Sequence, residues 1–229
     1  NPDNLQLRLA DAKLRSLSGK PVDLSAIGTP RNDGERVAYA EALLAQNKFA
    51  EATEQFNLLV ANANDAKKLA ALGDLTFMIK DLTNAEAAYK KLATMPGGQD
   101  SSKRGLHQVA KARQATKQDL NLANDLSRRK QFNSAVDKYH AAIFSDPRNA
   151  SARLGLAETL ERFFQQDPKA IRESVMQYKA YESLTPAMPQ KELDRLHKLT
   201  ARLELKATKL ERALAQGKKP NIVARIMMR

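Results

Sequence analysis

The side chains that could support acid–base or metal chemistry are few and scattered along this 229-residue chain. It contains three histidines, His107, His140 and His197, and no cysteine. None of these histidines has a second histidine or a glutamate at the i+4 spacing that places two zinc ligands on one helix face. We therefore interpret all three as structural or solvated residues and predict no metal site.

Motifs of nucleotide-binding and hydrolytic enzymes are also missing from the sequence. There is no G-x-x-x-x-G-K-[ST] loop to cradle a phosphate, no G-x-G-x-x-G and no G-x-S-x-G nucleophile motif. Neighbouring carboxylates such as Glu51 and Glu54 lie in an amphipathic pattern, where exposure to solvent explains them. The sequence therefore predicts a protein that is not an enzyme and that binds no cofactor.

Apolar residues at helical spacing define the elements that would have to position any functional side chain. The pattern is clearest in residues 119–149, where small and aromatic residues alternate along two helical faces joined at a turn. Two antiparallel helices can approach closely only where one supplies a small residue and the other an aromatic ring. The residues that carry this pattern are Leu122, Ala123, Leu126, Phe132, Ala135, Tyr139, Ala142 and Pro147.

These residues and spacings resemble a tetratricopeptide (TPR) repeat. Similar spacings recur over residues 33–65 and 66–99, where Gly73 is the expected point of close approach, and a degenerate copy follows over 150–185. The resemblance implies an all-α fold, a TPR-like right-handed superhelix of antiparallel helix pairs with a long C-terminal capping helix.

The predicted organisation has four parts. An N-terminal helix over residues 3–18, with Asp3 as its N-cap, continues into a linker rich in glycine and proline. At an irregular junction, either one long helix spans 102–129 or a short helix is inserted, and we favour the long helix because neither glycine nor proline interrupts 106–130. The expected parts are 1–32 (helix and linker); 33–185 (hairpins 33–65, 66–99, 116–149 and 150–185, with junction 100–118); 186–217 (capping helix); and 218–229 (tail).

The resemblance also implies where a partner binds, because the first helix of each TPR pair lines a concave groove. The candidates combine apolar side chains with charges of both signs, which suits a peptide or helix with apolar anchors and a polar rim. We therefore predict a non-catalytic scaffold for protein–protein interactions. The candidate groove residues are Glu41, Leu44, Asp74, Phe77, Leu120, Asn124, Arg128, Glu158 and Arg162.

In general appearance the chain is similar to bacterial TPR lipoproteins that assemble pili or secretion machines, including those of the tight-adherence type. That similarity implies secretion or pilus components as partners and a periplasmic or outer-membrane-anchored protein, with a cytoplasmic location as the alternative. The first residue is Asn rather than Met, so we expect a processed or truncated chain.

The formal net charge of +12 is concentrated in two zones. Residues 101–131 carry eight basic side chains against two acidic ones, and residues 187–229 carry eleven against four. The alternative function is therefore binding of nucleic acid or of an anionic membrane surface. Binding of nucleic acid in the groove is disfavoured because three of the four equivalent groove positions (41, 74, 124 and 158) are acidic and would repel phosphate. Peripheral membrane contact through the basic C-terminal helix stays as an alternative.

Residues 189–216 form a long predicted helix with a seam whose positions are three and four residues apart. The seam residues are Leu193, Leu196, Thr200, Leu203, Ala207, Leu210 and Leu214. The helix either packs along the preceding hairpin as a cap or forms a coiled-coil dimer. We favour the cap, and a monomer, because Thr200 and Ala207 would weaken a free-standing dimer. For residues 221–229, an apolar and basic tail, we leave open disorder, packing on the last helix, and addition as a strand to a partner's sheet.

Overall fold

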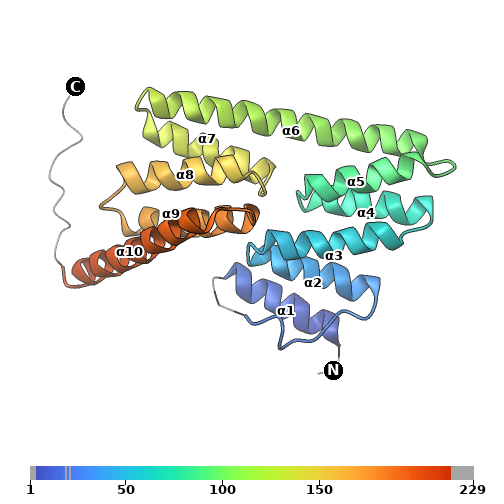
Figure 1. The fold of residues 1–229 in the computed structure, drawn as a ribbon, viewed down its shortest axis with the longest axis horizontal. Helices are drawn as coiled ribbons and strands as arrows, with labels where there is room; N and C mark the ends of the chain where they lie inside the picture. The colour runs from blue at the N-terminus through green and yellow to red at the C-terminus, as the bar shows by residue number, and fades with distance from the viewer. Residues whose placement is uncertain (1–3, 19, 21, 218–229) are drawn as a thin grey trace. The chain divides into compact units, whose positions relative to one another are not determined.

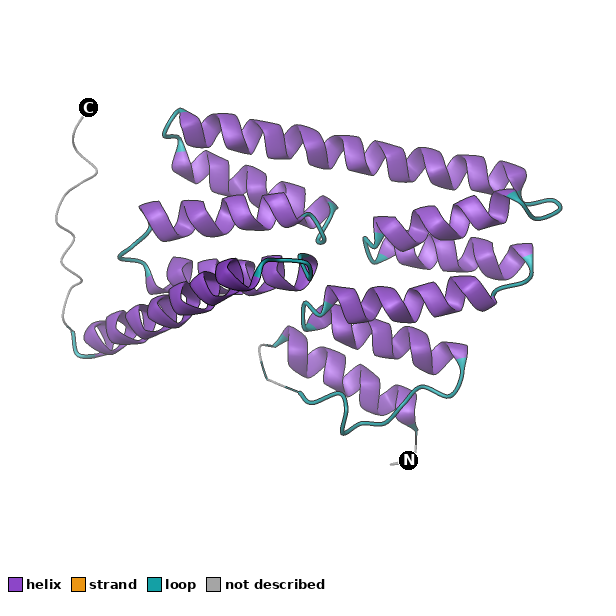
Figure 2. Cartoon of the chain, in the orientation of Figure 1, coloured by secondary structure: helices purple, strands orange, loops and turns teal. Residues whose placement is uncertain are grey.

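The computed structural model describes residues 4–18, 20 and 22–217, and in this part of the chain it contains helices and no strand (Figures 1 and 2). The predicted all-α class is confirmed. None of the described helices combines the length and apolar character needed to cross a membrane. The helices are α1 (Leu5–Leu17), α2 (Asp33–Ala45), α3 (Phe49–Asn62), α4 (Ala66–Met78), α5 (Leu82–Ala93), α6 (Gln99–Arg128), α7 (Phe132–Ser145), α8 (Ala150–Phe163), α9 (Pro168–Leu184) and α10 (Gln190–Ala215).

The helices belong to two compact units. Unit 1 comprises Asn1–Lys117 together with Phe144–Arg148, and unit 2 comprises Gln118–Ile143 together with Asn149–Arg229. The border between them falls inside the 30-residue helix α6. Each unit has its own buried apolar clusters.

Unit 1 is built from antiparallel helix pairs in which α1 packs on α2, α2 on α3 and α4 on α5. The sequence specifies where α1, α2, α4 and α5 begin, because an aspartate or asparagine caps the first turn of each, whereas α3 follows Lys48 without a side-chain cap. The Asn32 side chain accepts from the Glu35 N–H, and the Asp65 side chain accepts from the Lys68 N–H. Asn47, with a φ of 58°, lies in the short turn between α2 and α3. Within residues 33–65 the structure has α2 and α3, and within 66–99 it has α4 and α5.

Tyr89 forms the centre of a tightly packed region of unit 1. A Cβ atom added to Gly73 of α4 would lie 2.5 Å from the Tyr89 ring, and one added to Gly105 of α6 would lie 2.4 Å from it. The predicted close approach at Gly73 is confirmed, and Gly105 provides a second one. The Tyr89 hydroxyl donates to Asp74 Oδ1 at 2.7 Å, so the buried ring keeps its polar atom satisfied.

Unit 2 repeats this arrangement with different residues. The ring of Tyr139 on α7 lies against Gly155 of α8, where an added Cβ would come within 2.5 Å of it. The Tyr139 hydroxyl donates to Asn124 Oδ1 at 2.7 Å. Helix α10 then packs along α9, with Leu203 and Ala207 buried in one cluster with residues of that helix. The interpretation of α10 as a cap on the preceding hairpin agrees with this contact.

The structure also answers the questions left open at the junction and at the N-terminus. Residues 99–128 form one continuous helix, which is the alternative that the sequence favoured. The predicted N-cap Asp3 is wrong, because the Asn4 side chain accepts from the Leu7 N–H and α1 begins at Leu5. The linker is also more than a spacer, since Leu24 is buried against residues of α1 to α3. The tail predicted at 218–229 lies outside the described residues.

Candidate functional site

Three of the predicted groove residues, at equivalent positions of three hairpins, are engaged within the chain. Asp74 and Asn124 each accept a hydrogen bond from the tyrosine fifteen residues later. Glu41 forms an ion pair with Lys13 of α1, with 2.8 Å between Nζ and Oε2. For Asp74 and Asn124, a polar residue fifteen positions before a tyrosine was the signal in the sequence, whereas Glu41 lies fifteen positions before Phe56 and no such spacing marks its contact with Lys13.

The apolar groove candidates are partly buried against the cores of their own units. Leu44 and Phe77 pack against the main apolar cluster of unit 1, and Leu120 packs against a cluster of unit 2. Phe77 also has the Lys80 ammonium 5.8 Å from its ring centroid, a cation–π distance. These side chains therefore contribute to packing as well as to the surface.

The charged candidates Arg128, Glu158 and Arg162 are exposed and all lie in unit 2. Arg128 pairs with Asp125 of the same helix at 3.0 Å, and its side chain keeps 77% of its accessible surface. The Arg162 guanidinium lies 5.9 Å from the centroid of the Phe163 ring. The nine candidates are thus divided between the units, with residues 41, 44, 74 and 77 in unit 1 and the others in unit 2.

A pocket of about 420 Å³ lies in unit 2, where α7 begins, α8 ends and α9 begins. Its lining combines four apolar side chains with five polar or charged ones. None of the nine predicted groove residues contributes to it, because the pocket is lined mainly from the second helices α7 and α9 and takes only Leu160 from within the first helix α8. The lining residues are Val136, Leu160, Phe164 and Ala170, with Asn133, Asp137, Asp167, Lys169 and Glu173.

The charged side chains of this pocket are mainly acidic. Asp167 is held in place as the N-cap of α9, where it accepts from the Lys169 N–H at 2.9 Å. Glu173 lies 3.3 Å from His140 Nε2 on α7. Asp137 is exposed and forms no ion pair with a described residue. A cationic group beside an apolar one would therefore complement this lining.

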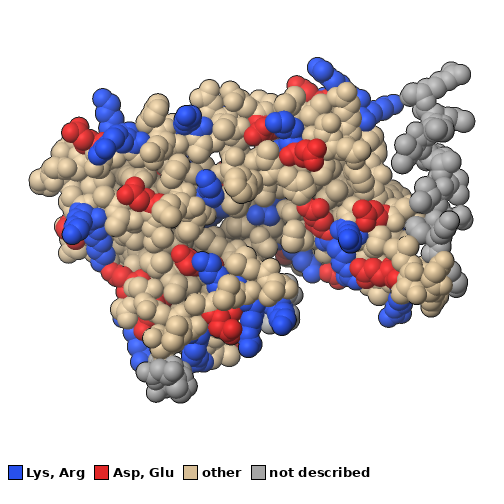
Figure 3. Space-filling model, turned by 180° about the vertical axis from the view of Figure 1, so that it is seen from behind, with Lys and Arg blue, Asp and Glu red and all other residues tan. Residues whose placement is uncertain are grey.

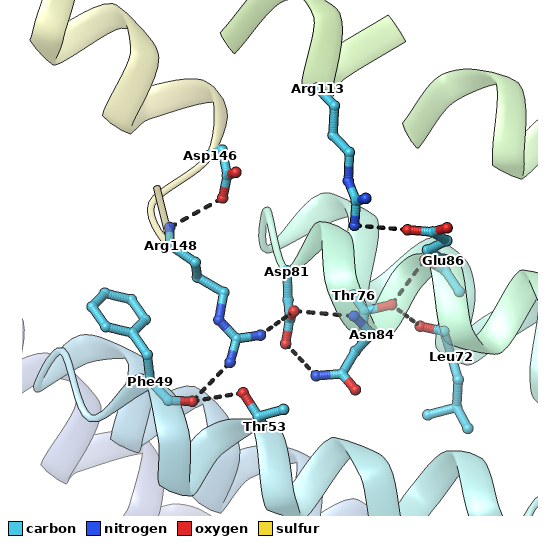
Figure 4. Close-up of polar contacts among 11 residues, drawn as sticks. Phe49, Thr53, Leu72, Thr76, Asp81, Asn84, Glu86, Arg113, Asp146 and Arg148 are labelled. Carbon is cyan, nitrogen blue, oxygen red and sulfur yellow. Dashed lines mark hydrogen bonds and ion pairs between the residues drawn. The ribbon is translucent and has the colours of Figure 1, made fainter. Parts of the chain in front are cut away.

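A second polar cluster, in unit 1, is buried and held together by hydrogen bonds and ion pairs, although the buried Asn84 Oδ1 has no hydrogen-bond partner among the described residues (Figure 4). The Arg148 guanidinium forms an ion pair with Asp81 and donates to the Phe49 carbonyl oxygen at 2.8 Å. The Asp81 side chain has no accessible surface, and it also accepts from Asn84 Nδ2 at 2.7 Å. Burial raises the pKa of Asp146 in the same segment as Arg148. These mutual contacts give the cluster a structural role.

The histidines form only pairwise contacts. His140 faces Glu173, and His197 Nε2 lies 2.9 Å from Glu182 Oε1. Over the residues that the structure describes, no three His, Cys, Asp or Glu side chains converge as a metal site would require.

Comparison with known proteins gives no family assignment. No protein-family model matches the chain, and no curated protein matches its sequence. The function must therefore be argued from the geometry of the chain itself.

Proposed function

We propose that this protein is a non-catalytic, protein-binding scaffold and that the pocket between α7, α8 and α9 holds a segment of its partner. The observation that carries the proposal is the composition of this pocket, whose lining combines four apolar side chains with three acidic ones and one basic one. Its volume of about 420 Å³ falls within the range of about 300–1,000 Å³ typical of ligand pockets.

The lining favours a particular kind of peptide. Val136, Leu160 and Phe164 offer apolar contact, while Asp137 and Glu173 at the rim attract positive charge. A lysine or arginine satisfies both demands, because its aliphatic stem buries along apolar surface while its charged end reaches the carboxylates. The preferred ligand is therefore a peptide with an apolar residue next to a basic one.

The broader architecture supports a scaffold. Consecutive helix pairs, with a tyrosine packed on glycine in both units, support a TPR-like superhelix, the class of fold from which the peptide-binding role is inferred. Assembly of a bacterial secretion or pilus machine, in the periplasm or at the outer membrane, stays a prediction that rests on general resemblance alone.

A displayed library of random peptides, selected on the whole protein, tests the proposal. We expect enriched peptides to carry an apolar residue beside lysine or arginine. The substitution Asp137→Lys should weaken the binding of an enriched peptide by about tenfold or more, measured by fluorescence anisotropy, because it replaces attraction by repulsion at the rim.

The matched control is Glu54→Lys, the same charge change at an exposed position of α3 in unit 1. It should leave the affinity unchanged. Enriched peptides that bind the Asp137 variant as tightly as the unaltered protein would show that the pocket is not the site.

A further inference from the structure

Helix α10 has two faces of opposite character. One face carries the apolar seam that packs on α9, in which Leu203 and Ala207 are buried and Leu196 and Leu210 are partly buried. At 100° per residue, the basic residues of α10 fall on the opposite side of the helix, within about a third of its circumference. They are Lys191, Arg195, Lys198, Arg202, Lys206, Lys209 and Arg212, called here the α10 basic row.

The α10 basic row is long, straight and accessible. Its residues follow one another at intervals of three or four positions from the first turn of the helix to the last. With a rise of 1.5 Å per residue, the row extends for about 32 Å. All of its members are exposed except Lys206, which is half-buried.

Two of the four acidic residues of α10 are engaged with α9, whereas Glu192 and Asp194 near its start are exposed and make no ion pair with a described residue. Seven basic side chains therefore leave the row with an excess of positive charge. Glu204 pairs with Lys179, and Glu211 pairs with Arg172, each at 2.7 Å. Within the row, Arg202 approaches Glu161 at 3.6 Å, and its side chain keeps 71% of its accessible surface. The other six cations form no ion pair with a described residue. On the face shown in Figure 3, by contrast, acidic and basic side chains are interspersed.

We propose that the α10 basic row binds an anionic lipid surface. A row of cations on one side of a helix can meet a flat layer of headgroups along the whole length of that helix. Each Lys or Arg near such a surface contributes about 1 kcal/mol. Leu205, which is 57% exposed and lies within the row, adds an apolar contact at the middle of the helix.

The geometry favours lipid over two other polyanions. A nucleic acid duplex is itself a rod, so a crossing helix would meet it with only part of the row, and α10 has no Phe, Tyr or Trp side chain for stacking on bases. A partner helix with acidic side chains could make one apolar contact with the row, to Leu205. Its other contacts would be surface ion pairs, each of which contributes about 0–1 kcal/mol.

Co-sedimentation of the whole protein with vesicles tests this inference, which does not depend on the proposed peptide site. Vesicles of phosphatidylcholine with phosphatidylglycerol should bind the protein, and binding should fall with added salt, while phosphatidylcholine alone should not. Combined substitution of Arg195, Lys198 and Lys209 by Gln should weaken binding by about 100-fold.

The matched control replaces three exposed lysines of the other basic zone by Gln, Lys103, Lys111 and Lys117 on α6, with the same loss of charge. This variant should bind vesicles nearly as well as the unaltered protein. Equal losses in both triple variants would overturn the inference, as would binding of a DNA duplex that depends on the row without any binding of vesicles. The Asp137→Lys variant should keep its vesicle binding, which separates this test from that of the peptide pocket.

Discussion

At the scale of single residues, Tyr89 sets how closely three helices of unit 1 approach one another. Its ring is buried on α5, with Gly73 of α4 and Gly105 of α6 both too close to accept a side chain without displacement. The neighbouring atoms belong to a rigid ring in a packed core, so they cannot yield as the end of an exposed side chain can.

Replacing Gly105 by Ala should therefore destabilise the protein. The added Cβ would lie 2.4 Å from the Tyr89 ring, and overpacking of a core typically costs about 1–3 kcal/mol. This loss should exceed the gain of up to about 1 kcal/mol from the higher helix propensity of alanine. Urea unfolding measures the difference.

Gly34→Ala is the matched control, because its Cβ would meet the end of the flexible Gln6 side chain. That variant should be neutral or slightly stabilising. A Gly105 variant as stable as the Gly34 variant would show that Tyr89 is not held as tightly as the structure indicates.

At the scale of elements, ion pairs link helices that already meet through apolar contacts. Glu86 on α5 pairs with Lys90 of the same helix at 2.6 Å and with Arg113 of α6 at 2.7 Å. The hydrogen bond from Lys90, followed by the charge of Arg113, lowers the pKa of Glu86. A carboxyl whose pKa is lower in the folded state stabilises that state wherever it is ionised.

The substitution Glu86→Gln should accordingly reduce stability at neutral pH and not in acid. Because the Glu86 side chain is 25% exposed, the expected loss is that of a partly screened pair, about 0.5–1 kcal/mol. The difference from the unaltered protein should disappear as the pH falls through the lowered pKa, since both side chains are then neutral. Thermal unfolding over a series of pH values measures it, and a difference that persists in acid would mean that lost packing, not lost charge, is the cause.

At the scale of the whole molecule, the chain forms two units with separate cores, and a short segment far along the sequence belongs to the first. Phe144–Arg148, which includes the end of α7, is part of unit 1. The Arg148 side chain, 12% exposed, pairs there with the fully buried Asp81 carboxylate. Such a pair is costly to break on one side only, because the remaining charge is left buried without a partner.

Substitution of Arg148 by Ala should lower the stability of unit 1 by about 3–5 kcal/mol. Hydrogen exchange followed by mass spectrometry should show reduced protection in α2 to α5 and little change in α8 to α10. The double variant Asp81→Asn, Arg148→Met should recover much of the loss, because no unpaired charge remains. A loss of protection of the same size in both units would contradict the separation of their cores.

The sequence by itself determined the helices, their limits and some of their contacts. Helical periodicity and the caps at Asn32 and Asp65 depend on residues three or four positions apart, so they can be recognised without the fold. The continuity of α6, the contact at Gly73 and the position of α10 along α9 were predicted in this way. The TPR-like superhelix and its partner stay predictions.

Only the tertiary structure decided which side chains meet. Asp74 and Asn124 accept hydrogen bonds from tyrosines fifteen residues away, and Arg148 pairs with the carboxylate of Asp81, 67 residues away. The tertiary structure also formed the pocket from Val136, Leu160 and their neighbours on three helices rather than from the nine predicted groove residues. The physical reason is that a periodic pattern specifies which face of a helix is apolar, whereas pairing depends on how that face packs against residues distant in sequence.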